Sequence, residues 1–156
     1  MFFFIIGLLT QNVIAGTGHF NSESHLYDHE FKWNKAPKIY LCKDNGIKIK
    51  DVKTGRDFWN DKLKREKLKS IKWTTKCDKP KKGSILIKRG ETDYGELGYE
   101  ETWKHKKTGN PTKALIVISD DLEGKNLLRE VIAHELGHAI GIDHCTKCKN
   151  NDLMSE

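Results

Sequence analysis

The chain has 156 residues, which suffice for one domain and fall short of two. Its 28 Lys and Arg outweigh its 22 Asp and Glu, so the net charge is +6, a mild excess that can favour acidic partners without indicating a nucleic-acid binder. Only 3 Pro and 13 Gly exclude a collagen-like or Pro-rich fibre, and 32% charged residues exclude a multi-span membrane protein. The 4 Trp, 6 Phe and several aliphatic runs argue against a fully disordered chain.

The first fifteen residues, MFFFIIGLLTQNVIA, carry no charged side chain. Their apolar run, residues 2–9, is too short to cross a bilayer as a helix, which needs about 20 residues, so we expect no stable membrane span. The run suits the apolar centre of a secretory signal peptide, with Val13 and Ala15 placed before a cleavage point at Gly16. We therefore predict that residues 1–15 direct secretion to the extracellular space. The alternatives are an apolar N-terminal anchor that tethers the chain to a membrane and a strand packed in the core.

Residues 16–32 are polar and are interpreted as a linker or a short pro-segment. Within them, His25 and His29 stand four positions apart and could share a helix face, although a solvated linker explains them more simply than a metal site. The folded domain is therefore expected over residues 33–156.

The domain shows strand and helix patterns in succession, which predicts an α/β (α+β) fold. Strands are predicted at 38–43, 70–75, 84–89, 99–105 and 114–119, and a helix at 51–69. The run at 114–119, ALIVIS, is continuously apolar and suits a strand buried on both faces, whereas 99–105 alternates and suits a half-exposed strand. The lysines of residues 62–69 indicate a solvated face rather than a nucleic-acid groove.

A second helix is predicted over residues 127–140, where apolar side chains recur at steps of three and four and form a buried stripe. Asn126 is its predicted N-cap. Gly141 is predicted to end it in the left-handed conformation that glycine adopts without steric cost.

The chemistry is concentrated in this helix, where the sequence H-E-L-G-H begins at His134 and places His138 one turn later, so both histidines can point at one ion. Glu135 stands beside the first histidine and can reach a water on that ion without binding the ion itself. After Gly141 turns the chain back, His144 completes the pattern H-E-x-x-H-x-x-G-x-x-H as a third ligand. Three histidines leave the fourth tetrahedral position of a Zn²⁺ ion open for water, as a catalytic zinc site requires.

This eleven-residue motif resembles the signature of the metzincin zinc metalloproteases. In that family a methionine turn follows the third histidine and packs beneath the metal, and Met154 stands at the corresponding place. The short interval from His144 to Met154 is most similar to the matrixin branch. The order of predicted elements over residues 33–156 is similar to the upper half of a metzincin catalytic domain. The resemblance implies a zincin fold, in which a twisted mixed sheet packs on the active-site helix and a second helix, and an antiparallel edge strand, here 99–105, binds extended substrate.

Several positions depart from the family pattern. Cys145 stands where matrixins typically have serine, and a cysteine there resembles the archaemetzincins. Ser155 follows Met154 where many metzincins carry a tyrosine one or two positions on. The family's C-terminal helix is not expected either, so the pocket beyond the scissile bond is predicted to be loose or completed by a partner. No cysteine-containing latency motif is expected, and Asp28 or Glu30 is the candidate cap for the metal.

The site predicts a zinc-dependent endopeptidase acting on a protein or peptide substrate. The Nε2 atoms of His134, His138 and His144 are expected to hold one Zn²⁺, which activates a water and polarises the scissile carbonyl. Glu135 is expected to accept the water proton and pass it to the leaving amine. The alternatives are a secreted zinc-binding module that does not cleave, and a cationic binder of acidic partners in which Cys145 closes a purely structural zinc site.

The chain has four cysteines. In an oxidising compartment this even number indicates two disulfides. Cys42–Cys77 and Cys145–Cys148 are the simplest pairing; free thiols or a redox pair are the alternatives.

Acidic residues in the loops leave a structural Ca²⁺ open, although ordinary solvated carboxylates explain them equally well. The candidates are Asp93, Glu96, Asp120, Asp121 and Glu123. The sequence indicates neither an oligomeric state nor a cleavage preference.

Overall fold

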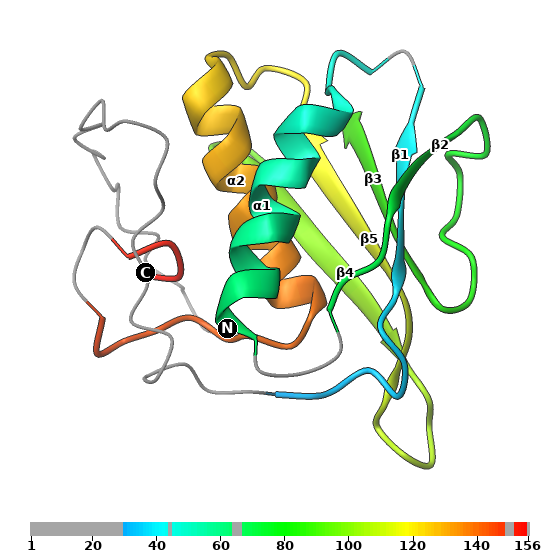
Figure 1. Cartoon of the computed structure of the whole chain (residues 1–156). Coiled ribbons are helices and arrows are strands. Elements are labelled where there is room, and N and C mark those ends of the chain that lie inside the picture. The colour runs from blue at the N-terminus through cyan, green and yellow to red at the C-terminus, as the bar shows by residue number, and fades with distance from the viewer. Residues whose placement is uncertain (1–29, 44, 64–66, 149–151, 156) are drawn as a thin grey trace, which may run out of the picture.

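The computed structural model describes residues 30–43, 45–63, 67–148 and 152–155. The predictions for residues 1–15 and 16–29, including His25, His29 and Asp28, lie outside the described residues. The described chain forms five strands and two helices (Figure 1). In chain order these are β1 (Lys38–Cys42), α1 (Ile49–Lys62), β2 (Ile71–Thr74), β3 (Ser84–Gly90), β4 (Gly98–Lys104), β5 (Pro111–Ser119) and α2 (Lys125–Ala139).

The strands form one mixed sheet in the order β2-β1-β3-β5-β4. The pairs β1–β2, β1–β3 and β3–β5 are parallel, and β4 pairs antiparallel with β5. The sheet confirms the predicted α/β class with an antiparallel edge strand. β5 lies inside the sheet, which explains why its apolar run is continuous.

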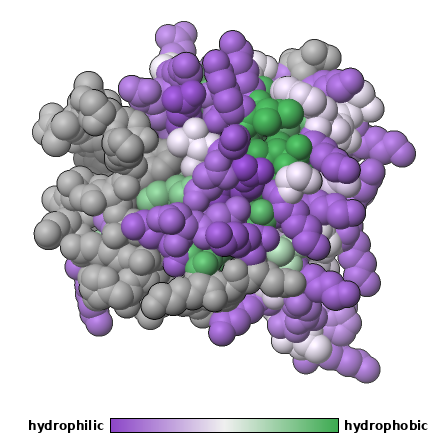
Figure 2. Space-filling view, in the orientation of Figure 1, coloured by the Kyte–Doolittle hydropathy of each residue, from purple (hydrophilic) through white to green (hydrophobic). Residues whose placement is uncertain are grey.

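Both helices cover the same face of the sheet and lie side by side (Figure 1). Inward side chains of the central strands, such as Ile39, Ile85 and Ile116, are fully buried beneath them with Trp59 of α1 and Leu136 of α2. This face holds the main hydrophobic core. The helix side of the molecule is mostly hydrophilic on its outer surface, with small hydrophobic patches (Figure 2).

The opposite face of the sheet carries a smaller cluster. Cys42, Leu86 and Val117 are buried there, with Tyr40 and Trp103 packed against them. No helix covers this face in Figure 1. The two faces of one sheet therefore differ in how much of their surface the described helices cover.

The first helix is shorter than predicted: α1 covers Ile49–Lys62, and the prediction of helix to residue 69 was wrong. The reason is a side-chain contact that replaces helical hydrogen bonds. Leu68 N–H donates to Asn60 Oδ1 at 2.6 Å, and Asn60 Nδ2 donates to the Leu68 carbonyl at 3.2 Å. Leu68 is 5% exposed, so this contact returns an apolar side chain to the core.

The start of α2 was also predicted wrongly. The N-cap is Gly124, with φ of 89°, and Asn126 lies inside the first turn. Gly124 carbonyl accepts the Leu128 N–H at 2.9 Å. At the other end, Gly141 has φ of 90°, as predicted from its place after the helix.

Two disulfides, Cys42–Cys77 and Cys145–Cys148, confirm the predicted pairing. Two disulfides fit an extracellular protein. None of the helices in the described part of the chain is both long and apolar enough to span a membrane.

Candidate metal centre

His134 and His138 lie one turn apart on α2, and each ring is oriented by a backbone carbonyl. Nδ1 of His134 lies 2.7 Å from the Leu153 carbonyl oxygen, and Nδ1 of His138 lies 2.9 Å from the Ile142 carbonyl oxygen. A carbonyl oxygen can only accept, so Nδ1 carries the proton in both rings and Nε2 keeps its lone pair. The loop after α2 therefore selects the tautomer that a metal needs.

His144 reaches these two histidines through the loop that Gly141 starts. Residues 30–33 cross this turn: Glu30 N–H donates to the Gly141 carbonyl at 2.9 Å, and Trp33 Nε1 donates to the Ala139 carbonyl at 2.8 Å. A Cβ at Gly141 would lie 2.3 Å from the Phe31 carbonyl oxygen. Glycine is therefore required there both by its positive φ and by the crossing chain.

The three Nε2 atoms form a small triangle. They lie 3.0 Å apart between His134 and His138, and 3.2 Å from each of these to His144. Nitrogens bound to one tetrahedral Zn²⁺ at about 2.0–2.1 Å lie about 3.3–3.4 Å from one another. The triangle therefore fits one shared ion closely.

The protonation of His134 and His138 also indicates a site for a cation. Because Nδ1 of His134 and His138 already donates to a carbonyl, neither neutral ring has a hydrogen to place between the two Nε2 atoms. Burial lowers the pKa of His134 to about 4 and also lowers that of His138, so both rings are neutral near pH 7. Two lone pairs brought within 3.0 Å repel unless a cation lies between them. The three histidines could therefore hold a metal ion, and the donor set suits zinc.

Glu135 follows the first histidine and is only 7% exposed. Burial, with a smaller contribution from the nearby carboxylates of Glu100 and Glu96, raises the pKa of its carboxyl to about 8. The start of β4 packs against it: a Cβ at Gly98 would lie 3.4 Å from Glu135 Cγ and 2.9 Å from Val131 Cγ1. A buried carboxyl, next in sequence to the first histidine, thus lies against the start of the edge strand.

Met154 packs beneath the site. It is fully buried, and its backbone carbonyl accepts the Cys145 N–H at 2.7 Å. A Cβ at Gly137 would lie 2.7 Å from Met154 Sδ and 2.6 Å from Trp59 Cζ2. Gly137 lies between His134 and His138 in the chain, so the methionine and the tryptophan support the turn of α2 that carries both rings.

Three further candidates from the sequence, each considered as a metal ligand or as a cap on the metal, do not join the histidines. Cys145 is bonded to Cys148, so its sulfur is not a thiolate ligand, which counts against a closed structural zinc site. Glu30 forms an ion pair with Lys104 at 3.4 Å rather than capping the histidines. Among the described residues, only the three histidines group closely enough to hold a metal, so the loop carboxylates that suggested Ca²⁺ form no such group.

Sequence reasoning missed two contributors to the site. Glu100 lies near Glu135, and burial raises its pKa while the Thr102 hydroxyl, which donates to it, opposes that rise. Residues 30–33, assigned largely to a linker, hold the Gly141 turn. The alternation of residues 99–105 showed that every second side chain of β4 faces inward, but not that Glu100 faces α2.

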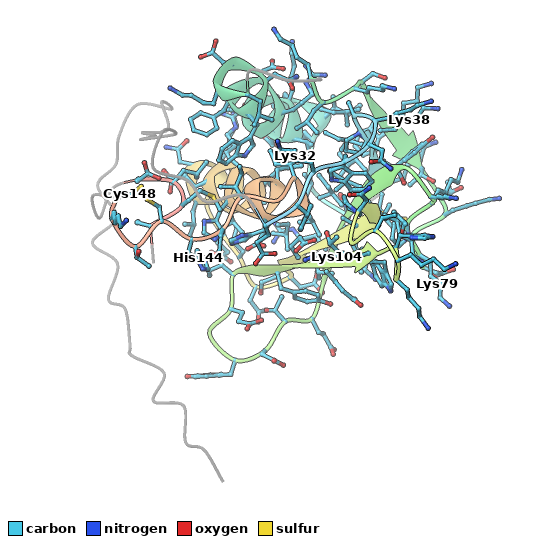
Figure 3. All side chains as sticks on the ribbon, turned by 90° about the horizontal axis from the view of Figure 1, so that it is seen from below. Lys32, Lys38, Lys79, Lys104, His144 and Cys148 are labelled. Atoms are coloured by element: carbon cyan, nitrogen blue, oxygen red, sulfur yellow. A yellow bond between two sulfur atoms is a disulfide. The ribbon has the colours of Figure 1, made fainter. Side chains whose placement is uncertain are left out.

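Figure 3 places His144 beside α2, on the opposite side of the molecule from Lys38 and Lys79.

No family model matches this sequence, and no curated protein matches it either.

Proposed function

We propose that this protein is a zinc-dependent endopeptidase of the metzincin type. The single observation that carries the proposal is the triangle of Nε2 atoms, 3.0–3.2 Å apart, with the buried carboxyl of Glu135 in the same helical turn. His134, His138 and His144 would hold the ion. When bound, Zn²⁺ supplies Lewis-acid polarisation of a carbonyl and lowers the pKa of a bound water.

Glu135 is the proton carrier in this proposal. It accepts the proton of the attacking water and later donates it to the leaving amine, which balances the hydrolysis of one peptide bond. The pKa of this carboxyl is about 8 in the metal-free chain. The charge of a bound Zn²⁺ would lower that pKa and so favour the carboxylate that accepts the water proton. The metal does not need this residue as a ligand, so an intact Glu135 favours catalysis over zinc storage.

The edge strand β4 is the proposed seat of the substrate. It pairs with β5 on one side and ends the sheet on the other. Gly98 at its start lies so near Glu135 that an added Cβ would stand 3.4 Å from Glu135 Cγ. An extended peptide can add to such an edge by backbone hydrogen bonds, which would place a peptide bond near Glu135.

The metzincin assignment rests on the motif and on the order of elements. The fold has the implied mixed sheet with an antiparallel edge strand packed on two helices, and Met154 lies beneath the histidines. Secretion by way of residues 1–15 and a protein or peptide substrate are part of the same proposal.

The test is cleavage of an unfolded protein by the purified zinc-loaded chain, compared with Glu135→Gln and with Glu130→Gln. Glu130 is exposed on the same helix and is the matched control. We expect Glu135→Gln to keep one zinc per chain, measured by mass spectrometry of the metal, and to lose at least about 100-fold in cleavage rate. Glu130→Gln should match the parent.

Equal cleavage by the parent and Glu135→Gln would overturn the role of Glu135. A parent that binds zinc yet cleaves no unfolded protein would overturn the endopeptidase proposal and favour a non-catalytic zinc-binding module.

A further inference from the structure

The face of the sheet opposite the helices gathers lysines that lie far apart in the sequence. The register places Lys72 beside Tyr40, and Lys113 beside Trp103. Lys38 and Lys88 share the side-chain direction of Tyr40 and Leu86, which belong to the cluster on this face. Four different strands therefore contribute one lysine each.

The loop after β2 adds three more. Lys76, Lys79 and Lys81 line a shallow hollow together with Tyr40 and Leu86. We call this surface the lysine face: Lys38, Lys72, Lys76, Lys79, Lys81, Lys88 and Lys113. Figure 3 shows Lys38 and Lys79 on the side of the molecule away from His144.

Positive charge on the lysine face is not balanced by described carboxylates. The ion pairs in the described ranges use Arg56, Lys104 and Arg129, and none uses a lysine of this face. The register places Glu101 on this face, and Asp78 lies in the loop. Seven lysines against two carboxylates make a strongly cationic surface, which attracts a polyanion.

The spread of the lysines favours a long anion with repeated charges. Lys72 on β2 and Lys113 on β5 are separated by three strand spacings, which amount to about 14 Å. A single phosphate cannot contact both. A linear polymer with a charge on each repeat can contact several of these ammonium groups at once.

Two of the three strand aromatics on this face, Tyr40 and Trp103, argue against a nucleic acid, whereas the third, Tyr99, is 36% exposed. Lys81 Nζ lies 5.2 Å from the centre of the Tyr40 ring, and Lys113 Nζ lies 4.6 Å from that of Trp103, so these rings are already covered by ammonium groups rather than open to bases. Neither of the two described helices lies on this face, so neither can enter a major groove there. In the extracellular setting that two disulfides fit, the corresponding polyanion is a sulfated polysaccharide.

We propose that the lysine face binds a sulfated polysaccharide and so holds the protein on an anionic matrix while the histidine site stays accessible. The probe is heparin of defined length, with desulfated heparin and duplex DNA as comparisons. Binding to the full chain is measured by calorimetry at low and at physiological salt. We expect heparin to bind, the affinity to fall as salt rises, and desulfated heparin to bind at least about tenfold more weakly.

Two variants of equal net charge distinguish binding by the lysine face from attraction by the net charge of the protein. One carries Lys38→Gln, Lys72→Gln and Lys79→Gln; the control carries Lys50→Gln, Lys53→Gln and Lys125→Gln, which are exposed on the helices. We expect the first to lose at least about tenfold in heparin affinity and the control less than about twofold. Far-ultraviolet circular dichroism checks that both are folded.

Equal losses in the two variants would show attraction by net charge alone and would overturn the proposal. Undetectable heparin binding would overturn it as well, and tighter binding to DNA with the same dependence on the lysine face would replace the polysaccharide with a nucleic acid.

Discussion

The two faces of one sheet carry their polar chemistry in opposite ways. On the helix side, three imidazoles lie within 3.2 Å of one another, and beside them a glutamate is 7% exposed. On the other side, most of the lysines of the lysine face are exposed and are spread over four strands and a loop. The first arrangement depends on the position of each atom, whereas the second depends on the number of charges.

This difference decides what a substitution does. Burial removes water from His134 and Glu135 and shifts their pKa values in the direction that favours the neutral forms. One change there removes a function. Exposed ammonium groups stay hydrated and act together, so a single lysine can be exchanged with little effect and only several changes alter binding.

The largest effect is expected from loss of one ligand. His138→Ala leaves two nitrogens and should reduce bound zinc from one per chain to nearly none, with loss of at least about 100-fold in cleavage. His105→Ala, at an exposed position in the turn between β4 and β5, is the control and should keep its zinc. Zinc retained by His138→Ala would show that the triangle is not the metal site.

The two disulfides test the faces separately. Cys42–Cys77 spans 35 positions and Cys145–Cys148 spans 3, so replacing each pair by Ala should cost about 4 and about 2 kcal/mol in the free energy of unfolding. The variant without Cys145–Cys148, which loses less stability, should show the larger drop in zinc affinity, because Cys145 adjoins His144. Denaturant unfolding and zinc titration measure both. A drop in zinc affinity confined to the Cys42–Cys77 variant would contradict the separation of the faces.

The buried carboxyl of Glu135 gives the metal-free protein a defined pH dependence. The folded chain holds this proton up to pH about 8, while the unfolded chain releases it near 4.5, so the stability due to neutral Glu135 is complete below pH 4.5 and is lost as the pH rises toward 8. Glutamine cannot ionise. With the metal removed by a chelator, the free energy of unfolding of Glu135→Gln should exceed that of the parent by almost nothing at about pH 4. At about pH 7 it should exceed it by about 3 kcal/mol.

Thermal unfolding across this pH range, with Glu130→Gln alongside, measures the gain. A gain that did not change with pH would show that the Glu135 carboxyl is not buried as the site requires.

The smallest effect is expected at the turn before His144. Gly141→Ala forces a Cβ toward the Phe31 carbonyl and should cost about 2 kcal/mol and weaken zinc binding, because the loop to His144 must move. Gly109→Ala is the control: its φ is 68° and no atom lies within 4 Å of the added Cβ, so only the backbone cost of about 1 kcal/mol applies. Equal zinc affinity in both variants would show that residues 30–33 do not hold the turn.

Much of the fold follows from local patterns. The strands came out within about three residues of prediction because apolar alternation and turn residues mark them directly. The end of α1 was predicted wrongly, because it depends on the contact between Asn60 and Leu68, which are eight residues apart. The prediction of the α2 N-cap was also wrong. Asn126 has a side-chain type that is preferred at N-caps, but Gly124 occupies that position.

The candidate site was predictable in part. The spacing of His134 and His138 is a property of any helix, and the sequence also named Glu135, Gly141, His144 and Met154. It did not show that carbonyls of Ile142 and Leu153 select the tautomer of the rings, because those contacts form only when the loop folds back under α2.

The sequence by itself determined the helical pairing of the two histidines, the alternation of the strands and the positive φ after α2, because each depends on neighbours a few residues away. Tertiary structure alone decided the distance between the three Nε2 atoms, the burial of Glu135 against β4 and the gathering of lysines on one face. These depend on strand order and register, which bring together residues up to about a hundred positions apart, and no local pattern specifies them.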